Sequence, residues 1–205
     1  MSLFITFEGG EGTGKTVQAR ALYRRLSKLA IPVVLTYEPG GTQLSKIIGR
    51  WLKKIQDIDI LPLTELLLFN ASRAQLVAED IRPSLEEGKI VICARYADST
   101  IAYQGYGRGL DLGTVKAINN AATQGLEPDL TFLLDMPVAE GFTRKKNQKP
   151  DRFEIEDVTF HQKVREGYLK LAANEPKRWL VINASQPKEK IEQIIWQRVS
   201  QLLSS

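Results

Sequence analysis

Cysteine and histidine are scarce in this chain, which holds one of each among 205 residues. The cysteine, Cys93, has no partner for an internal disulfide, and its place in an apolar run predicts a role in core packing. This cysteine usage suits a reducing compartment, so we expect a cytoplasmic protein. The histidine, His161, stands among charged residues in a predicted helix, and we expect it on the surface rather than in catalysis.

Long hydrophobic runs and blocks of one charge are also missing. No stretch approaches the roughly 18 apolar residues of a membrane-spanning helix, and no basic leader precedes an apolar run, so we expect a soluble chain without a membrane partner. The net charge is +4, but the 28 basic residues are scattered among 24 acidic ones. This scatter favours anionic small molecules over nucleic acid as binding partners.

What the chain does contain is a phosphate-binding loop near its start. The apolar run 4–7 leads into the pattern Gly-x-x-x-x-Gly-Lys-Thr, and a helix-forming segment follows. In such a loop the backbone N–H groups face a triphosphate, Lys15 reaches the β and γ oxygens, and the hydroxyl of Thr16 can ligate Mg²⁺. We therefore predict a nucleoside triphosphate site made of Gly9, Gly10, Glu11, Gly12, Thr13, Gly14, Lys15 and Thr16.

Alternating strand and helix patterns fill the rest of the chain. After the first strand, buried strands are predicted at 32–37, 89–94, 130–135 and 179–183. Helices are predicted at 15–30, 42–54, 63–87, 112–124, 138–146, 157–173 and 188–203. This order predicts an α/β fold with a doubly wound, five-stranded parallel sheet flanked by helices, built as one domain over residues 1–205. Its ligand cleft should lie at the carboxyl ends of the strands, and the polar residues 144–151 suggest a lid.

Two segments after the second strand carry candidate binding residues. The turn Glu38-Pro39-Gly40-Gly41-Thr42 has two glycines that allow a backbone to approach a ligand, although it is equally typical of an ordinary strand-to-helix connection. Phe69 and Arg73 are four residues apart in a predicted helix and therefore share a face, where they could hold a base. The alternative places Phe69 in the core and Arg73 in solvent.

The segment 95–109 follows the third strand and is rich in tyrosine, glycine and arginine. Its length leaves little room for core residues, so we interpret it as a binding segment at the ligand edge of the sheet. Arg95 can bind a phosphate with its fork of donors, while Tyr103 and Gln104 can contact a sugar and a base.

Taken together, these motifs resemble those of the thymidylate kinases. The resemblance covers nearly the whole chain, through the segments 7–16, 38–42, 65–77, 95–109, 128–130 and 151–154. It implies the P-loop nucleoside monophosphate kinase fold, with ATP as phosphoryl donor, dTMP as acceptor and Mg²⁺ as cofactor. It also implies a homodimer, for which the apolar faces of helices 63–87 and 112–124 are candidate contacts.

The resemblance further implies roles for single residues in substrate binding. Phe69 would stack on thymine and Arg73 would hydrogen-bond its carbonyl edge, while Gln104 would approach the base. Arg95 would take the dTMP phosphate, and Tyr103 would crowd the 2′ position so that deoxyribose is preferred. Glu11 would lie near the acceptor sugar and the magnesium, and Glu38 and Ser99 are assigned to the same pocket.

Phosphoryl transfer depends on alignment and on cations that stabilise the charged oxygens. The phosphate loop has no arginine, so the resemblance to the bacterial branch implies that a lid around residues 144–154 supplies one. The candidates are Arg144, Lys145, Lys146, Lys149 and Arg152. We favour Arg152 for the transition state and Arg144 for ATP, which with Lys15 and Arg95 makes the predicted catalytic set; the alternative is a solvated charge run.

Two positions depart from the family pattern. Ala94 stands where an aspartate usually precedes Arg95. The alanine side chain cannot hold the magnesium's water shell or orient the acceptor, so this task is lost or is taken over by Glu8, Glu11 or Asp98. Tyr37 stands where the bacterial branch usually has an arginine, which removes a cation beside the acceptor phosphate. Three hypotheses follow: a dTMP kinase, which we favour, a kinase of another deoxynucleoside monophosphate, or a nucleotide-binding protein with weakened catalysis.

The loop after the last predicted strand bears on which donor nucleotide the chain binds. A GTPase would need Asn-Lys-x-Asp after a late strand, whereas residues 183–187 read Asn-Ala-Ser-Gln-Pro. We therefore predict loose contact of this loop with adenine.

Overall fold

The computed structural model of the chain describes residues 2–54, 58–145 and 150–204. Within them lies a parallel sheet of five strands, in the spatial order β2-β3-β1-β4-β5. The strands are β1 (Leu3–Glu8), β2 (Val33–Tyr37), β3 (Ile90–Ala94), β4 (Leu130–Asp135) and β5 (Trp179–Asn183). The predicted doubly wound fold is confirmed, and the predicted strand ranges agree to within one residue.

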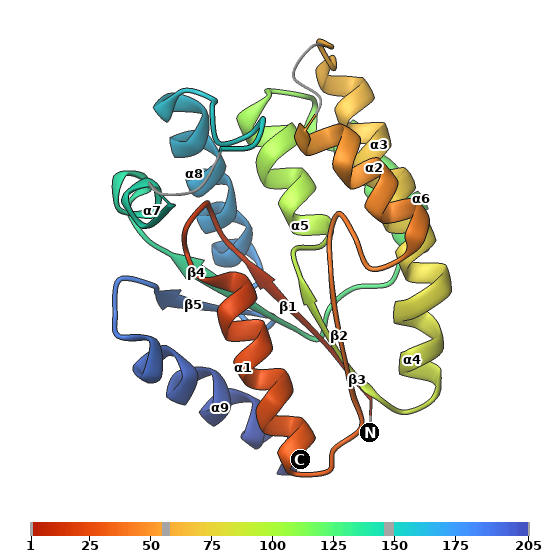
Figure 1. Cartoon of the computed structure of the whole chain (residues 1–205), viewed down its shortest axis with the longest axis vertical. Coiled ribbons are helices and arrows are strands. Elements are labelled where there is room, and N and C mark those ends of the chain that lie inside the picture. The colour runs from red at the N-terminus through yellow and green to blue at the C-terminus, as the bar shows by residue number, and fades with distance from the viewer. Residues whose placement is uncertain (1, 55–57, 146–149, 205) are drawn as a thin grey trace.

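Helices cover both faces of this sheet (Figure 1). α1 (Lys15–Lys28) and α9 (Lys188–Ser204) lie on one face, while most of the others lie on the opposite face or at the edge near β2. These others are α2 (Gln43–Lys54), α3 (Pro62–Leu76), α4 (Arg82–Glu86), α5 (Ala97–Thr100), α6 (Leu112–Thr123), α7 (Val138–Lys145) and α8 (Val158–Asn174), with the π-helical turns η1 (Val77–Ile81) and η2 (Ile101–Gly107). No helix in these ranges is long and apolar enough to cross a membrane.

Alternation along β1 divides the core between the two faces. Ile5 and Phe7 pack in the cluster beneath α1 and α9, whereas Phe4 belongs to a cluster on the other face with Cys93 and Tyr96. This is the period of two that a strand buried on both faces requires. Cys93 is fully buried, as its sequence context predicts.

The predicted helix 63–87 is one helical stretch with a widened turn. α3 continues through η1 into α4, and the π-helical turn comes just before Pro83. Proline has no backbone N–H to donate to the preceding turn, and a π turn is one way in which a helix continues past such a gap. The predicted helix 138–146 is described from Val138 to Lys145 as α7, and Lys146 lies outside the described residues.

The expectation that segment 95–109 offers little core was wrong. The structure folds most of it into α5 and η2, and Ile101, Ala102 and Tyr103 join a buried cluster on α8. The glycines that suggest a loop instead allow close packing, because a Cβ on Gly107 would lie 2.7 Å from the ring of Phe160.

The expected surface position of His161 was also wrong. Its side chain is 4% exposed and lies edge-on between the rings of Phe142 and Phe160, with centroid distances of 4.7 and 5.2 Å. Burial lowers the pKa of this imidazole. His161, Val164 and Tyr168 follow helical spacing on the buried face of α8, and that periodicity was the readable signal among the charged neighbours.

Two threonines join the central strands of the sheet through their side chains. The hydroxyls of Thr6 on β1 and Thr131 on β4 lie 2.8 Å apart, and both residues are fully buried. Arg178 also donates to the Thr131 hydroxyl at 2.9 Å. When a buried hydroxyl loses its hydrogen-bond partner, the free energy spent on removing it from water is no longer offset.

We therefore expect Thr6→Val and Thr131→Val each to lower the free energy of unfolding by about 1 to 3 kcal/mol. The double variant should lose less than the sum of the two, because both hydroxyls are then gone. Urea unfolding of the four proteins measures this. Strict additivity would contradict the proposed side-chain bond.

Candidate active site

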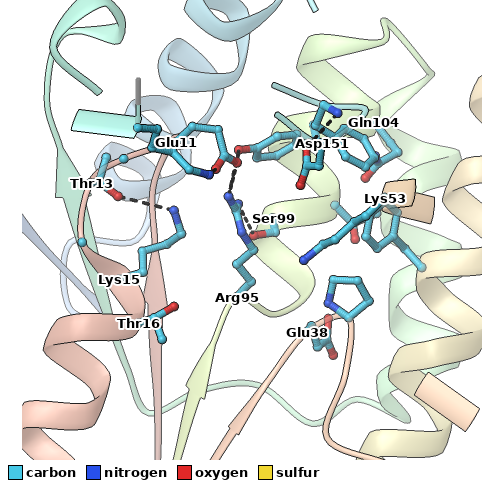
Figure 2. Close-up of a pocket in the computed structure, with 18 of the residues that line it drawn as sticks. Glu11, Thr13, Lys15, Thr16, Glu38, Lys53, Arg95, Ser99, Gln104 and Asp151 are labelled. Carbon is cyan, nitrogen blue, oxygen red and sulfur yellow. Dashed lines mark hydrogen bonds and ion pairs between the residues drawn. The ribbon is translucent and has the colours of Figure 1, made fainter. Parts of the chain in front are cut away.

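A cavity of about 520 Å³ lies at the carboxyl ends of β1, β2 and β3 (Figure 2). Its position is the one that a doubly wound sheet predicts, and its volume lies within the usual range of ligand pockets. Of the predicted site residues, the lining includes Glu11, Gly12, Thr13, Gly14, Lys15, Thr16, Glu38, Phe69, Arg73, Arg95, Ser99, Tyr103, Gln104 and Arg144. Gly9, Gly10 and Arg152 do not line it.

The phosphate loop wraps around the ammonium group of Lys15. This group donates to the carbonyl oxygens of Gly9 at 3.0 Å and Gly10 at 2.5 Å, while Thr13 also donates to Gly10. Burial and the neighbouring charge of Arg95 lower the pKa of Lys15 to about 7. An arriving polyphosphate would restore the charged form, because a nearby opposite charge favours it.

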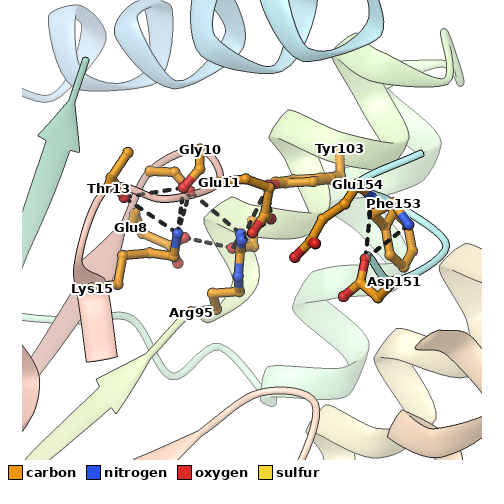
Figure 3. Close-up of polar contacts among 12 residues, drawn as sticks. Glu8, Gly10, Glu11, Thr13, Lys15, Arg95, Tyr103, Asp151, Phe153 and Glu154 are labelled. Atoms are coloured by element: carbon orange, nitrogen blue, oxygen red, sulfur yellow. Dashed lines mark hydrogen bonds and ion pairs between the residues drawn. The ribbon is translucent and has the colours of Figure 1, made fainter. Parts of the chain in front are cut away.

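Glu11 connects the loop to three other parts of the fold, of which Arg95 and Tyr103 are labelled in Figure 3. Its carboxylate forms an ion pair with Arg95, accepts a hydrogen bond from the Tyr103 hydroxyl at 2.8 Å, and pairs with Lys145 at 3.1 Å. Burial alone would raise its pKa, but the charges of Arg95, Lys15 and Lys145 outweigh that effect and hold the pKa of Glu11 well below its usual value. Glu11 is therefore ionised in this arrangement.

Arg95 reaches this cluster from a strained backbone position. Its φ of 71° is in the left-handed region, which costs a non-glycine residue about 1 to 3 kcal/mol. The backbone N–H of Arg95 donates to Phe7 at 3.0 Å, and its guanidinium lies over the ring of Tyr103 at 5.0 Å from the centroid. This conformation aims the guanidinium across the end of β1 towards the phosphate loop.

Beneath the loop, Glu8 ends β1 in a fully buried hydrogen-bond network. Its carboxylate accepts from the backbone N–H of Tyr96 at 2.7 Å and from the hydroxyls of Ser99 at 2.6 Å and Tyr168 at 3.0 Å. Burial, with a smaller contribution from Asp98, raises the pKa of Glu8 to about 7. Tyr168 is a contact that sequence reasoning missed, since it lies far along the chain in α8.

The raised pKa of Glu8 makes stability depend on pH. The unfolded carboxyl releases its proton near pH 4.5, whereas the folded one keeps it to about pH 7. The folded state therefore binds more protons in this window, and the free energy of unfolding falls as pH rises through it. We expect the stability of the protein relative to Glu8→Gln to fall by up to about 3 kcal/mol between pH 4.5 and 7.5 and then to level off.

Urea unfolding of both proteins across this pH range is the measurement. Glu166→Gln serves as control, because Glu166 lies on the exposed face of α8. A stability difference between Glu8→Gln and the parent chain that stays flat with pH would rule out the proposed titration.

On the far side of the cavity, Phe69 lies beside a buried arginine. The guanidinium of Arg73 is 1% exposed and grips Glu38 through two nitrogens, at 2.9 and 2.6 Å. It also donates to four further acceptors: Asn70, Asn119, Thr100 and the carbonyl oxygen of Tyr96. The structure thus excludes the alternative of a solvated Arg73. A base contact by Arg73 stays a prediction, since protein acceptors already engage its donors.

The other predicted base contact, Gln104, is held by the helix opposite. Its amide nitrogen donates to Glu65 at 2.7 Å, and Glu65 also pairs with Arg108 and Arg152. Phe69 and Gln104 therefore line one wall of the cavity from α3 and η2. We call this wall the Phe69 side.

The lid candidates fall into two groups. Arg144 lines the cavity and donates to the carbonyl oxygen of Ala184 at 3.0 Å, which brings it to the loop predicted to contact adenine. Lys145 joins Glu11 and Glu154. Lys146 and Lys149 lie outside the described residues.

Arg152 has a different position in this structure. It donates to the carbonyl oxygens of Leu52 at 3.1 Å and Ile60 at 3.4 Å and pairs with Glu65. These contacts fasten the end of the lid that carries Arg152, which we call the far arm of the lid, to α2 and to the start of α3. A transition-state contact by Arg152 stays a prediction, and in this structure it would require release from these partners.

The helix that leads into the lid, α7, is packed directly on the phosphate loop. A Cβ on Gly12 would lie 2.0 Å from the carbonyl oxygen of Gly141, and one on Gly141 would lie 2.2 Å from that of Glu11. Gly12 also has a φ of +71°, which side-chain-bearing residues rarely adopt. Backbone thus touches backbone where α7 meets the loop.

The structure shows the surroundings of Ala94 and Tyr37, the two departures from the family pattern. Ala94 is 6% exposed and ends β3, and Asp98, one possible substitute, is bound by both terminal nitrogens of Arg178 at 2.7 and 3.1 Å. Tyr37 is 47% exposed, and its ring lies against Gly40 outside the cavity lining. The glycines of this turn serve protein packing, since a Cβ on Gly41 would meet Leu76 at 2.4 Å.

A magnesium ion would find a suitable but sparse donor set. The described residues contain no group of three histidine, cysteine, aspartate or glutamate side chains arranged for a metal. Thr16 is exposed beside Lys15 in the cavity lining. Mg²⁺ in nucleotide sites commonly takes only one or two protein oxygens and completes its shell with phosphate oxygens and water, so the Thr16 hydroxyl fits this ion.

The strand order, the phosphate loop after β1 and the facing wall with Phe69 define a P-loop nucleoside monophosphate kinase fold. The family model described as thymidylate kinase matches residues 7–195 of the chain. The chain therefore belongs to the thymidylate kinase family.

Individual relatives agree with this family. A thymidylate kinase of Dehalococcoides mccartyi strain CBDB1 is 57% identical over 203 residues, covering 99% of this chain and 98% of the relative. One from Deinococcus radiodurans is 49% identical over 200 residues, with 97% of each chain covered. The crystal structure of thymidylate kinase from Ehrlichia chaffeensis superposes with a TM-score of 0.74 at 40% identity, over 88% of this chain and 92% of that one.

Proposed function

We propose that this chain, as one kinase domain, transfers the γ-phosphoryl group of ATP to dTMP and so forms dTDP. The observation that carries the proposal is one cavity lined by two nucleotide-binding features. The phosphate loop with Lys15 lies at one end, and Phe69 with Gln104 lies at the other. Arg95 stands between them, where donor and acceptor phosphates would meet (Figure 2).

The chemistry assigned to this cavity is positioning and charge stabilisation. Lys15 would bind β and γ oxygens, Arg95 would bind the acceptor phosphate, and Arg144 would lie along ATP near the 183–187 loop. Thr16 would hold Mg²⁺, which when bound offsets the charge of the phosphate oxygens. Tyr103, fixed by Glu11, would limit the space beside the sugar.

A coupled ADP-release assay with ATP and Mg²⁺ tests the proposal against a panel of dTMP, dUMP, dCMP, dGMP and UMP. We expect dTMP to have the highest kcat/KM, and UMP to be disfavoured because Tyr103 crowds a 2′ hydroxyl. Turnover only with another acceptor, or binding without turnover, would overturn the proposed reaction.

In the same assay, Phe69→Ala should lower kcat/KM for dTMP by about ten-fold or more, because stacking of a base on an aromatic ring is worth roughly 1 to 3 kcal/mol. Leu29→Ala is the control, since Leu29 is 54% exposed at the end of α1. An unchanged kcat/KM of Phe69→Ala for dTMP would contradict stacking of the base on Phe69.

We also propose a cytoplasmic homodimer with no nucleic-acid or membrane partner. Support for the dimer comes from α2, which is apolar on two sides. Its inner face is buried, yet Leu44, Ile47 and Trp51 are 38 to 49% exposed on the outer side. Leu63 and Leu67 of the adjoining α3 are 50 and 51% exposed. Clustered exposed apolar side chains are typical of an interface.

Light scattering at several concentrations tests the dimer. We expect twice the 23.0 kDa mass of the chain, and Trp51→Glu should shift it towards the monomer because a buried, unpaired charge is costly. Leu29→Glu places the same charge on a distant exposed site and should leave the mass unchanged. A monomeric parent chain, or a dimer indifferent to Trp51→Glu, would contradict this assignment.

A further inference from the structure

Lys53, in the last turn of α2, is a cavity residue that the motifs do not predict. It lines the cavity together with Arg95 and Phe69. Figure 2 shows its amine end reaching into the space between Arg95 and the turn at Glu38. It follows Ser45, Gly49 and Leu52 on the inner side of α2, so the buried face of this helix ends in a cation.

Lys53 differs from the other cations of the cavity in having no oxygen acceptor within hydrogen-bonding or ion-pair distance among the described residues, although the carboxylates of Asp151 and Glu11 line the same cavity. The others each have an oxygen acceptor within the protein: Lys15, Arg73, Arg95, Arg144 and Lys145. Across residues 2–54, 58–145 and 150–204, no hydrogen bond or ion pair reaches the Lys53 amine. Burial and the charge of Arg95 lower the pKa of this amine, and the charges of Asp151 and Glu11 offset this only in part, so the environment disfavours the charged form until a further anion arrives.

The position of Lys53 indicates which anion would relieve this cost. Lys15 and Thr16 lie across the cavity, with Arg95 between them and Lys53 (Figure 2). An anion held by both Arg95 and Lys53 therefore lies on the side of Arg95 away from the phosphate loop, in the cavity that Phe69 also lines. This is where a nucleoside monophosphate with its base on Phe69 places its phosphate.

We propose that the Lys53 ammonium group binds the 5′-phosphate of the acceptor nucleotide together with Arg95. This assignment rests on the proposed function, in which the Phe69 side receives the acceptor. It makes α2, rather than the β2 turn with its exposed Tyr37, the source of the second cation at that phosphate.

The far arm of the lid holds Lys53 in place. The backbone N–H of Arg152 donates to the carbonyl oxygen of Lys53 at 3.2 Å, and the Arg152 side chain donates to that of Leu52 at 3.1 Å. These two bonds satisfy carbonyl groups that the end of a helix leaves free. Arg152 thus acts as a positioning residue for Lys53.

Neighbouring cations of α2 supply a matched control. Lys46 and Arg50 are exposed and line an outer groove beside Tyr37, which Lys53 also borders, but of these three cations only Lys53 lines the main cavity. Replacing either removes a positive charge of the same helix without removing one from the proposed phosphate site.

The test compares the parent chain with Lys53→Met, Lys53→Arg and Lys46→Met. Isothermal titration measures binding of dTMP and of thymidine, which has the same base and sugar but no phosphate. Steady-state assays measure the KM for dTMP and for ATP. Thermal unfolding of each free protein reports whether the fold is kept.

We expect Lys53→Met to weaken dTMP binding about ten- to a hundred-fold, as loss of a charged hydrogen bond predicts, with thymidine binding and the KM for ATP changed less than about two-fold. Lys53→Arg should recover part of the loss, and Lys46→Met should match the parent chain. Because Lys53 is unpaired, Lys53→Met should not lower the thermal midpoint.

Three results would overturn the inference while the proposed function stands: unchanged dTMP binding by Lys53→Met, an equal loss of dTMP and thymidine binding, or a rise in KM for ATP alone. Failure of the parent chain to bind or phosphorylate dTMP would instead overturn the proposed function.

Discussion

The rest of the cavity depends on the contacts that the ionised carboxylate of Glu11 makes with its neighbours. It ties the phosphate loop to Arg95 after β3, to Tyr103 on η2 and to Lys145 at the end of α7. Without this one negative charge, Lys15, Arg95 and Lys145 would repel one another within a partly buried space. Glu11 therefore organises three cations around the place where phosphates are expected. The attraction between Glu11 and Arg95 also offsets the strain of the left-handed backbone conformation of Arg95.

Much of the fold was readable from the sequence because strand and helix periods differ so clearly. Runs such as Ile90–Ala94, bounded by glycine and polar residues, predict buried strands, and the phosphate loop fixes where the first strand ends. Local patterns failed where tertiary packing overrides them. Gly105 and Gly107 suggest a loop, yet both lie in η2, where their lack of a side chain accommodates Leu112 and Phe160.

The candidate site was predicted from motifs together with a family resemblance, and the structure brings most of its members to one cavity. What could not be predicted are the contacts between distant segments. Tyr168 reaches Glu8 across 160 positions of sequence, and no short motif encodes that distance. Lys53 carries only a weak signal, a lysine that ends the inward face of an amphipathic helix. The assignment of Arg152 to chemistry rested on its lid position, whereas its bonds to Leu52 and Glu65 depend on how the lid folds over α2.

The contact between Gly12 and Gly141 limits which residues can stand at either position. Two main chains meet there with no side chain between them, so a larger residue at Gly12 or Gly141 would have to push α7 away from the phosphate loop. Arg144 and Lys145 lie on the same short helix, so such a displacement would also move both cations relative to the loop.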